Sequence, residues 1–268
     1  MHFVSLTPLD LALAAVLIVI LAGLSWAARL AVERELLVAG ARTVIQLSLI
    51  GLVLKAVFAH VHLLWISLMA AAMVLAAGRE AMMRQERRFQ GWWGYGLGTL
   101  SMFVSSFALT VLALLTVIRT HPWYQPQYAI PLLGMILGNT MTGIALGLDR
   151  LTQTAWDQRR MLEQRLMLGE TAMEAVARIR RHAGRSGMIP IINAMAAAGI
   201  VSLPGMMTGQ ILAGAPPMEA VKYQILIMFL ISSGTGFGTL VAVWLGSRRL
   251  FDHRERLRLD RLSVPKHR

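Results

Sequence analysis

Uncharged apolar runs of about twenty residues recur along the whole of this chain. Charged residues make up 15% of the 268 residues and gather in short blocks between the runs, whereas 56% of the residues are hydrophobic. A helix needs about 20 mainly apolar residues to cross the hydrocarbon core of a bilayer. The pattern therefore predicts an all-α integral membrane protein with no separate soluble domain of ordinary size.

The runs predict a single domain that forms a seven-helix transmembrane bundle. Its spans cover residues 9–28, 37–58, 61–78, 95–118, 128–148, 188–213 and 223–247. A polar loop at residues 149–187 separates the fifth span from the sixth, and a basic tail follows at residues 248–268. Arg42 and Lys55 lie near the ends of the second span, where their long side chains can reach the membrane surface.

Basic residues predict the orientation of the bundle. Of the 26 lysine and arginine residues, 22 lie in alternate loops or in the tail, and only Arg119 and Lys222 lie in loops on the opposite side. Because loops rich in lysine and arginine stay in the cytoplasm, we expect the N-terminus outside the cell and the C-terminus inside. The net charge of +12 then reflects topology rather than nucleic-acid binding.

Small residues predict close packing of the helices. Glycines stand four residues apart at positions 94 and 98, 134 and 138, 143 and 147, 205 and 209, and 234 and 238. This spacing lets neighbouring helices approach closely. We expect a tightly packed bundle, and one such face is a candidate contact between two copies of the chain.

The residue types that the sequence lacks exclude several kinds of chemical site. There is no cysteine, which excludes disulfides, iron–sulfur clusters, thiolate zinc sites and thiol nucleophiles. No acidic residue lies inside a predicted span, whereas a proton-driven carrier normally keeps a titratable group in the membrane. A metalloenzyme motif of the His-Glu-x-x-His type is also missing. We therefore assign no catalytic residue and no metal ligand.

The sixth span contains a break at Pro204 and Gly205. Proline removes a helical hydrogen bond and glycine lets the backbone turn, which lipid tolerates only where protein or a water-lined cavity surrounds the freed groups. Broken helices of this kind are typical of transport sites. Freed carbonyl oxygens suit a hard cation, while free amides at the start of the next helix suit an anion, and the sequence leaves both open.

Polar groups inside the spans are candidates for a substrate pathway, although most such groups in membrane helices bond to neighbouring helices. The candidates are Gln46, Asn139, Thr140, Thr142, Asn193, Ser202, Thr208, Gln210, Gln224, Ser232, Ser233 and Thr235. Pro204, Gly205 and Gly209 join this set at the break. Met206 and Met207 offer thioethers to a soft metal ion, but methionine more often fills apolar space.

The loop at residues 149–187 predicts two helices, at residues 151–168 and 171–183. Thr171 and Glu174 have the spacing of a capping box, in which each side chain bonds the backbone amide of the other residue. The charge pattern alone leaves two interpretations, a solvated hairpin and a helix that docks on a partner protein.

The spacing within this loop resembles the coupling helix of ABC transporter permeases. The residues that carry the resemblance are Leu168, Gly169, Glu170, Thr171, Glu174, Ala175, Ile189 and Pro190. Together with residues 138–140, 205–214, 223 and 224, they make nearly the whole chain similar to the FetB-type permeases. That family comprises bacterial ABC membrane subunits implicated in iron export and is related to plant permeases of aluminium tolerance.

The resemblance implies a homodimer of permease chains in the inner (plasma) membrane, powered by a separate cytoplasmic ABC ATPase that binds the ATP. It also implies that iron or another metal is exported. The residues that would receive the motion of the ATPase are Gly169, Glu170, Thr171, Glu174, Ala175 and Arg178. No cofactor is expected in this chain, because Lys55, Lys222 and Lys266 do not stand in a phosphate-binding loop. The alternative is a secondary carrier or channel that moves a small ion without an ATPase.

Overall fold

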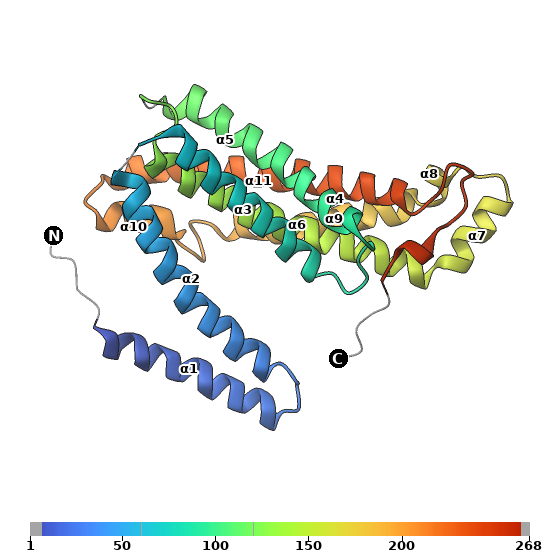
Figure 1. The fold of residues 1–268 in the computed structure, drawn as a ribbon, viewed down its shortest axis with the longest axis horizontal. Coiled ribbons are helices and arrows are strands. Elements are labelled where there is room, and N and C mark those ends of the chain that lie inside the picture. The colour runs from blue at the N-terminus through green and yellow to red at the C-terminus, as the bar shows by residue number, and fades with distance from the viewer. Residues whose placement is uncertain (1–6, 60, 120, 264–268) are drawn as a thin grey trace. The chain divides into compact units, whose positions relative to one another are not determined.

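The computed structural model describes residues 7–59, 61–119 and 121–263, and throughout these ranges its regular elements are helices (Figure 1). The chain divides into two compact units, one ending at His62 and the other beginning at Leu63. The prediction of an all-α protein is confirmed for the described residues.

The first unit consists of α1 (Pro8–Ala27) and α2 (Glu33–Ala59), which pack against each other. α1 begins with a capping box in which the Thr7 amide and hydroxyl both donate to the Asp10 carboxylate at 2.8 Å. Nearly all side chains of the two helices are exposed. Helices that are apolar on all sides and exposed need an apolar surrounding, which a bilayer provides.

The second unit contains the remaining helices. They are α3 (Leu63–Met83), α4 (Trp92–Met102), η1 (Phe103–Phe107), α5 (Ala108–Ala113), η2 (Leu114–Ile118), α6 (Pro126–Asp157), α7 (Arg159–Met167), α8 (Ala172–Ala175), α9 (Ala177–Ala197), α10 (Gly205–Leu212), α11 (Pro217–Arg249) and η3 (Leu259–Arg261). η1 and η2 are π-helical turns, and they join α4 and α5 into one continuous segment, Trp92–Ile118.

Six of these segments are long and apolar enough to cross a membrane, counting only the residues that the structure describes. They are Pro8–Ala27, Glu33–Ala59, Leu63–Met83, Trp92–Ile118, Pro126–Asp157 and Pro217–Arg249. These six match six of the seven predicted spans. The remaining prediction, residues 188–213, is divided, because α9 ends at Ala197 and α10 begins at Gly205.

The two helices predicted in the loop at residues 149–187 have the wrong boundaries. α6 runs on to Asp157 and α9 begins at Ala177, so the first predicted helix is shared between α6 and α7 and the second between α8 and α9. The change from apolar to charged residues marks where a helix leaves the hydrocarbon, which is not where it ends. The 32 residues of α6 extend over about 48 Å, compared with about 30 Å for the hydrocarbon core.

Two apolar clusters form the core of the second unit, and α6, α9 and α11 contribute to both. The larger one includes Leu148, Phe251 and Leu262, and we call it the tail-end cluster. The smaller one includes Ile136 and Ile231, and we call it the hairpin-end cluster because it lies toward the connection at residues 119–125.

The chain after α11 folds back on the bundle instead of forming a free basic tail. The Ser263 amide donates to Arg88 O, and the Gln90 amide donates to Arg261 O, both at 2.8 Å. The Ala172 amide at the start of α8 donates to the carboxylate of Glu255 in the tail at 3.2 Å. Residues 264–268 of the predicted tail lie outside the described residues.

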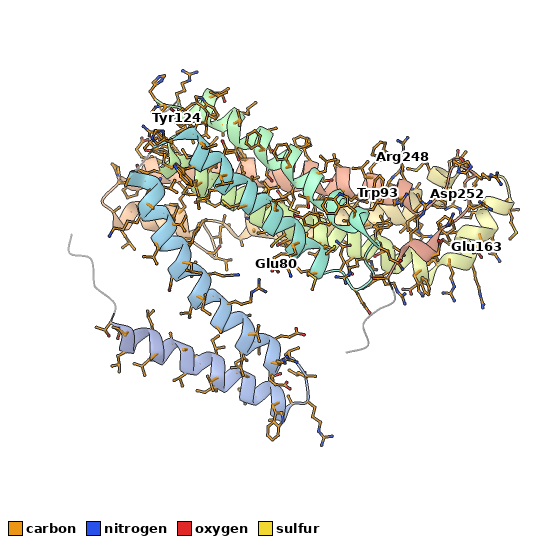
Figure 2. The ribbon with its side chains drawn as sticks, in the orientation of Figure 1. Glu80, Trp93, Tyr124, Glu163, Arg248 and Asp252 are labelled. Atoms are coloured by element: carbon orange, nitrogen blue, oxygen red, sulfur yellow. The ribbon has the colours of Figure 1, made fainter. Side chains whose placement is uncertain are left out.

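These bonds gather residues 84–91, α8 and the tail at one end of the second unit. Figure 2 shows Trp93, Arg248, Asp252 and Glu163 toward this end and Tyr124 at the other. The three segments are those whose basic residues predicted a common side of the membrane, so their clustering agrees with the predicted alternation of loops.

Candidate functional site

A layer of small and hydroxyl-bearing residues lies between the two apolar clusters on α9 and α11, whereas on α6 the two clusters overlap. Along α11, for example, the hairpin-end cluster stops at Ile231 and the tail-end cluster begins at Ala242. Between these levels α11, α6, α9 and η1 contribute small side chains to what we call the mid-bundle layer. Its members are Ser105, Ser106, Thr140, Gly143, Gly187, Thr235, Gly238 and Thr239.

Four hydroxyl groups of this layer are buried and have no hydrogen-bond partner among the residues that the structure describes. They belong to Ser106, Thr140, Thr235 and Thr239. A buried hydroxyl without a partner costs about 1–3 kcal/mol. Other buried threonines avoid this cost, as Thr110 does by donating to Ser106 O at 2.7 Å. The four hydroxyls therefore have unused hydrogen-bonding capacity, which water or a small ligand that reached them would satisfy.

Glycine brings the helices close enough to form the layer. A methyl group placed at Gly143 would lie 2.6 Å from Thr239 Oγ1 and 3.0 Å from Gly187 O, both too short for an ordinary contact. One placed at Gly238 would lie 2.8 Å from Ser105 Oγ. The close packing predicted from the glycine spacing is confirmed here, whereas Gly205 and Gly209 adjoin open space.

The π-helical turn η1 carries the two serines of the layer. Ser105 Oγ donates to Ser101 O at 2.8 Å, while the Ser106 hydroxyl has no partner. A π turn inserted in an α-helix shifts the register of the side chains and is frequent at functional sites.

The layer offers neutral oxygen ligands only. Hydroxyl groups both donate and accept, so they suit water, a hydrated ion or a chelated metal better than a bare transition-metal ion, which prefers imidazole or thiolate ligands. Over the described parts of the chain, no group of three or more His, Cys, Asp or Glu residues could hold a metal ion.

The predicted break in the sixth span is confirmed, and it is longer than expected. Residues 198–204 are not helical, with Gly199 at φ +81° and Pro204 as the N-cap of α10. The amides of Val201 and Ser202 both donate to Ala197 O, which closes the end of α9. Thr208 Oγ1 donates to Pro204 O at 3.2 Å, so its hydroxyl is already used inside the first turn of α10.

Two predicted glutamines carry unpaired amide oxygens. Gln210 lies on α10 and Gln224 on α11, two helices that pack together, and the Oε1 atom of each is buried without a partner. Both oxygens lie on the same side of the mid-bundle layer as the break.

The other predicted pathway residues of the second unit lie outside the mid-bundle layer. Asn139 and Ser202 are exposed, and Asn139 Nδ2 donates to Met135 O at 2.9 Å. Met207 is buried and Met206 packs on the hairpin-end cluster, as expected of apolar filler. Gln46 is exposed on α2 in the first unit.

Ser106 and Thr239 were missed by the sequence reasoning. The run at residues 232–239, in which glycine alternates with serine and threonine, was a usable signal for Thr239. Nothing in the sequence marks Ser106 as different from the neighbouring Ser105.

Local hydrogen bonds hold the turn between α7 and α8. The Glu170 amide donates to Arg165 O and the Gly169 amide to Leu166 O, with Gly169 at φ +93°, which is a Schellman motif. The capping box is confirmed, since the Thr171 amide donates to Glu174 Oε2 at 2.9 Å and the Glu174 amide donates to Thr171 Oγ1 at 3.4 Å. The bonds from Thr171 hold the pKa of the Glu174 carboxyl below its ordinary value.

Residues 167–175, which we call the α7–α8 corner, present apolar side chains to the outside. Met167 is 79% and Leu168 84% exposed. The corner is braced from within, because Arg165 pairs with Glu170 at 2.8 Å and donates to the carbonyl of the buried Ala175 at 2.9 Å. The last residue of the predicted coupling set, Arg178, lies exposed on α9.

The chain is similar in sequence to several known proteins. The model of a family described as "Uncharacterised protein family (UPF0014)" matches residues 8–251. The UPF0014 membrane protein slr1647 of Synechocystis is 39% identical over 83% of this chain and 85% of its own length. The probable iron export permease protein FetB of Escherichia coli is 32% identical over 97% and 98%. The Arabidopsis thaliana protein ALUMINUM SENSITIVE 3 is 32% identical over 87% and 83%. No solved structure matches.

Proposed function

Because the chain belongs to the UPF0014 family of membrane proteins, we propose that it is the permease subunit of an ABC transporter that exports iron or another metal. The observation that carries the proposal is the likeness, over 97% of this chain, to a protein named as a probable iron export permease. A relative whose name refers to aluminium supports a metal as the cargo. The ATP would be bound by a separate ATPase, and two permease chains would assemble in the inner membrane.

In this proposal the chain crosses the membrane seven times, with its N-terminus outside and its C-terminus in the cytoplasm. The six apolar segments provide six crossings, and α9 and α10 together provide the other. The basic residues of the 84–91 loop, the α7–α8 region and the tail support the assignment of that end to the cytoplasm.

The proposed pathway runs between α6 and α11. Substrate would meet the free hydroxyls of the mid-bundle layer and then the amide oxygens of Gln210 and Gln224. Weak, neutral ligands suit transport, because a cargo that is held weakly can leave. The non-helical residues 198–204 would let α10 move relative to α9.

α9 would transmit the motion of the ATPase. It begins next to α8, contributes Gly187 to the mid-bundle layer, and ends at the break. A displacement of the α7–α8 corner would therefore reach the layer and then the break through one continuous helix, with Pro190 lying between the two. This supports the corner as the part that contacts the partner.

Reconstitution tests the proposal directly. We expect purified chain in liposomes to move ferrous iron or another metal only when the ATPase and ATP are present. Equal flux without any ATPase would reject the proposal in favour of a secondary carrier or channel.

The double variant Met167→Ser and Leu168→Ser tests the docking role of the corner. Both side chains are exposed, so we expect normal insertion but a fall of roughly tenfold or more in ATP hydrolysis stimulated by the permease, because buried apolar anchors dominate binding energy at interfaces. Leu64→Ser is the matched control, since Leu64 is 75% exposed and lies in the first turn of α3, at the end of that helix opposite to residues 84–91. Wild-type stimulation in the double variant would remove the corner from the interface.

A further inference from the structure

A basic pocket lies between α6 and α9 near the cytoplasmic end of the second unit. Its volume is about 400 Å³, and its charged or titratable lining residues are Arg150, Arg178, Arg181, His182 and Arg185. No carboxylate of a described residue lines it. Positive charge is therefore concentrated here without an internal counter-ion.

The neighbouring groups neutralise only part of this charge. No ion pair within the described residues involves any of these arginines. Arg150 Nε donates to His182 Nδ1 at 3.3 Å, so the imidazole accepts at that atom and supplies no negative charge. The Asp149 carboxylate accepts the Glu86 amide and also attracts the Arg150 guanidinium, so it offsets part of the charge of Arg150, but Asp149 does not line the pocket. Arg178, Arg181 and Arg185 stand three and four residues apart on one helix face, where like charges repel.

An apolar groove adjoins the pocket. It lies between α9 and α11, has a volume of about 710 Å³, and is walled by Met188, Ile192, Leu240 and Trp244. Arg181 and Arg185 line both the groove and the basic pocket. The Arg248 guanidinium lies 4.2 Å from the ring centre of Trp244, and tryptophan next to arginine is typical of the membrane–water boundary.

We propose that an anionic phospholipid binds at this junction, with its phosphate at Arg181 and Arg185 and an acyl chain along the groove. The site places several guanidinium groups next to an apolar wall formed by α9 and α11. This combination matches a lipid, which has a charged head and an apolar tail. A free phosphate would bind the arginines but leave the groove empty. An acidic peptide would also bind the arginines, but it would leave the apolar wall of the groove in contact with lipid. The proposal uses the proposed orientation only to assign the site to the cytoplasmic leaflet, whose lipids carry negative charge, and it does not depend on the cargo.

The test measures lipid binding to the purified full-length chain by native mass spectrometry and by thermal unfolding. We expect phosphatidylglycerol or cardiolipin to remain bound and to raise the melting temperature, whereas phosphatidylcholine does neither. In the double variant Arg181→Gln and Arg185→Gln the affinity for the anionic lipid should fall roughly 30-fold. The control Arg160→Gln with Arg254→Gln removes the same charge from two residues outside both pockets and should bind the lipid normally.

Three results would overturn the proposal. The first is undiminished lipid binding by the double variant, or by both single variants if the double variant fails to fold in neutral lipid. The second is an equal thermal shift with inorganic phosphate, which would indicate a simple anion site. The third is a disulfide-linked dimer of a Leu240→Cys variant, which is interpretable because the chain has no cysteine and would show that a second copy covers the groove. Failure of metal transport, by contrast, would leave the lipid site intact.

Discussion

At the scale of single residues, the hydroxyl groups of the mid-bundle layer stand out because they oppose stability. Ser106, Thr140, Thr235 and Thr239 are buried without partners, although each threonine hydroxyl could in principle bond a carbonyl of its own helix, as Thr152 does with Leu148 O at 3.1 Å. A sequence selected for stability alone would place valine or alanine at such positions. Buried polar groups that lower stability in this way are common at functional sites, where a passing ligand supplies the missing hydrogen bonds.

Replacing Thr239 by valine separates stability from function. The methyl group fills the same space and removes a free hydroxyl, so the free energy of unfolding should stay constant or rise by about 1 kcal/mol. Metal flux in liposomes should fall about tenfold if the hydroxyl stabilises the passing cargo by about 1.4 kcal/mol at the rate-limiting point, and Thr239→Ser should keep most of it.

Thr110→Val is the matched control for this experiment. The Thr110 hydroxyl already donates to Ser106 O, so its loss should lower the free energy of unfolding by about 1 kcal/mol and leave flux unchanged. Normal flux in Thr239→Val would show that the free hydroxyl has no part in transport.

At the scale of elements, the contact between α6, α9 and α11 depends on glycine. α6 and α9 meet with backbone close to backbone at Gly143 and Gly187, and the side chain of Thr239 on α11 packs against both glycines, which leaves no space for a side chain at either position. In a bilayer, where burial of apolar surface does not drive helices together, such close contact is a main source of association energy. The same contact fixes the positions of the Thr235 and Thr239 hydroxyls.

Gly143→Ala should therefore destabilise the bundle by about 1–3 kcal/mol, because the new methyl group overlaps Thr239 and the backbone of α9. Gly138→Ala on the same helix has no atom within 4 Å of the new methyl group and should stabilise α6 by about 0.5–1 kcal/mol. Unfolding in mixed micelles measures both values. Equal stability of the two variants would contradict the observed contact.

At the scale of the whole molecule, each described unit has its own packing, and the tail closes the end of the second unit that carries residues 84–91 and α8. Hydrogen bonds join the tail to the 84–91 loop and to α8, and they link the α7–α8 corner to the end of α11. Asp252 forms the turn that starts this return, because its carboxylate accepts the backbone amides of Arg254 and Arg256 at 2.9 Å and pairs with the Arg256 guanidinium at 2.9 Å.

The tail should respond to pH through Asp252. Chiefly through the bond from the Arg256 amide, its pKa is lowered from 3.8 to about 2. A lowered pKa means that the carboxylate stabilises the folded turn fully above pH 3.8 and that this contribution is lost as the pH falls from 3.8 toward 2. A spin label at His253→Cys should therefore be immobile at pH 7 and become mobile only in that acidic range.

Asp252→Asn should give the mobile spectrum already at pH 7. Asp260→Asn is the control, since Asp260 bonds only the guanidinium of its neighbour Arg258 within the described residues. An immobile label in Asp252→Asn at neutral pH would show that the turn is held by other contacts.

The sequence by itself determined the membrane class, six of the spans, the break at Pro204 and the capping box at Thr171. Each of these features depends on a short stretch of chain. The membrane class and the spans depend on the length of apolar runs, the break on a proline, which has no amide hydrogen, and the capping box on two side chains three residues apart. The tertiary structure alone decided that α6 and α9 continue beyond the apolar runs, that the tail returns to the bundle, and that Ser106, Thr140 and Thr239 share one layer. It also decided that arginines of α6 and α9 face a common pocket. These features join residues as far apart as Arg88 and Ser263 through contacts between helices, and a local pattern of residues carries no information about which distant partner a helix will meet.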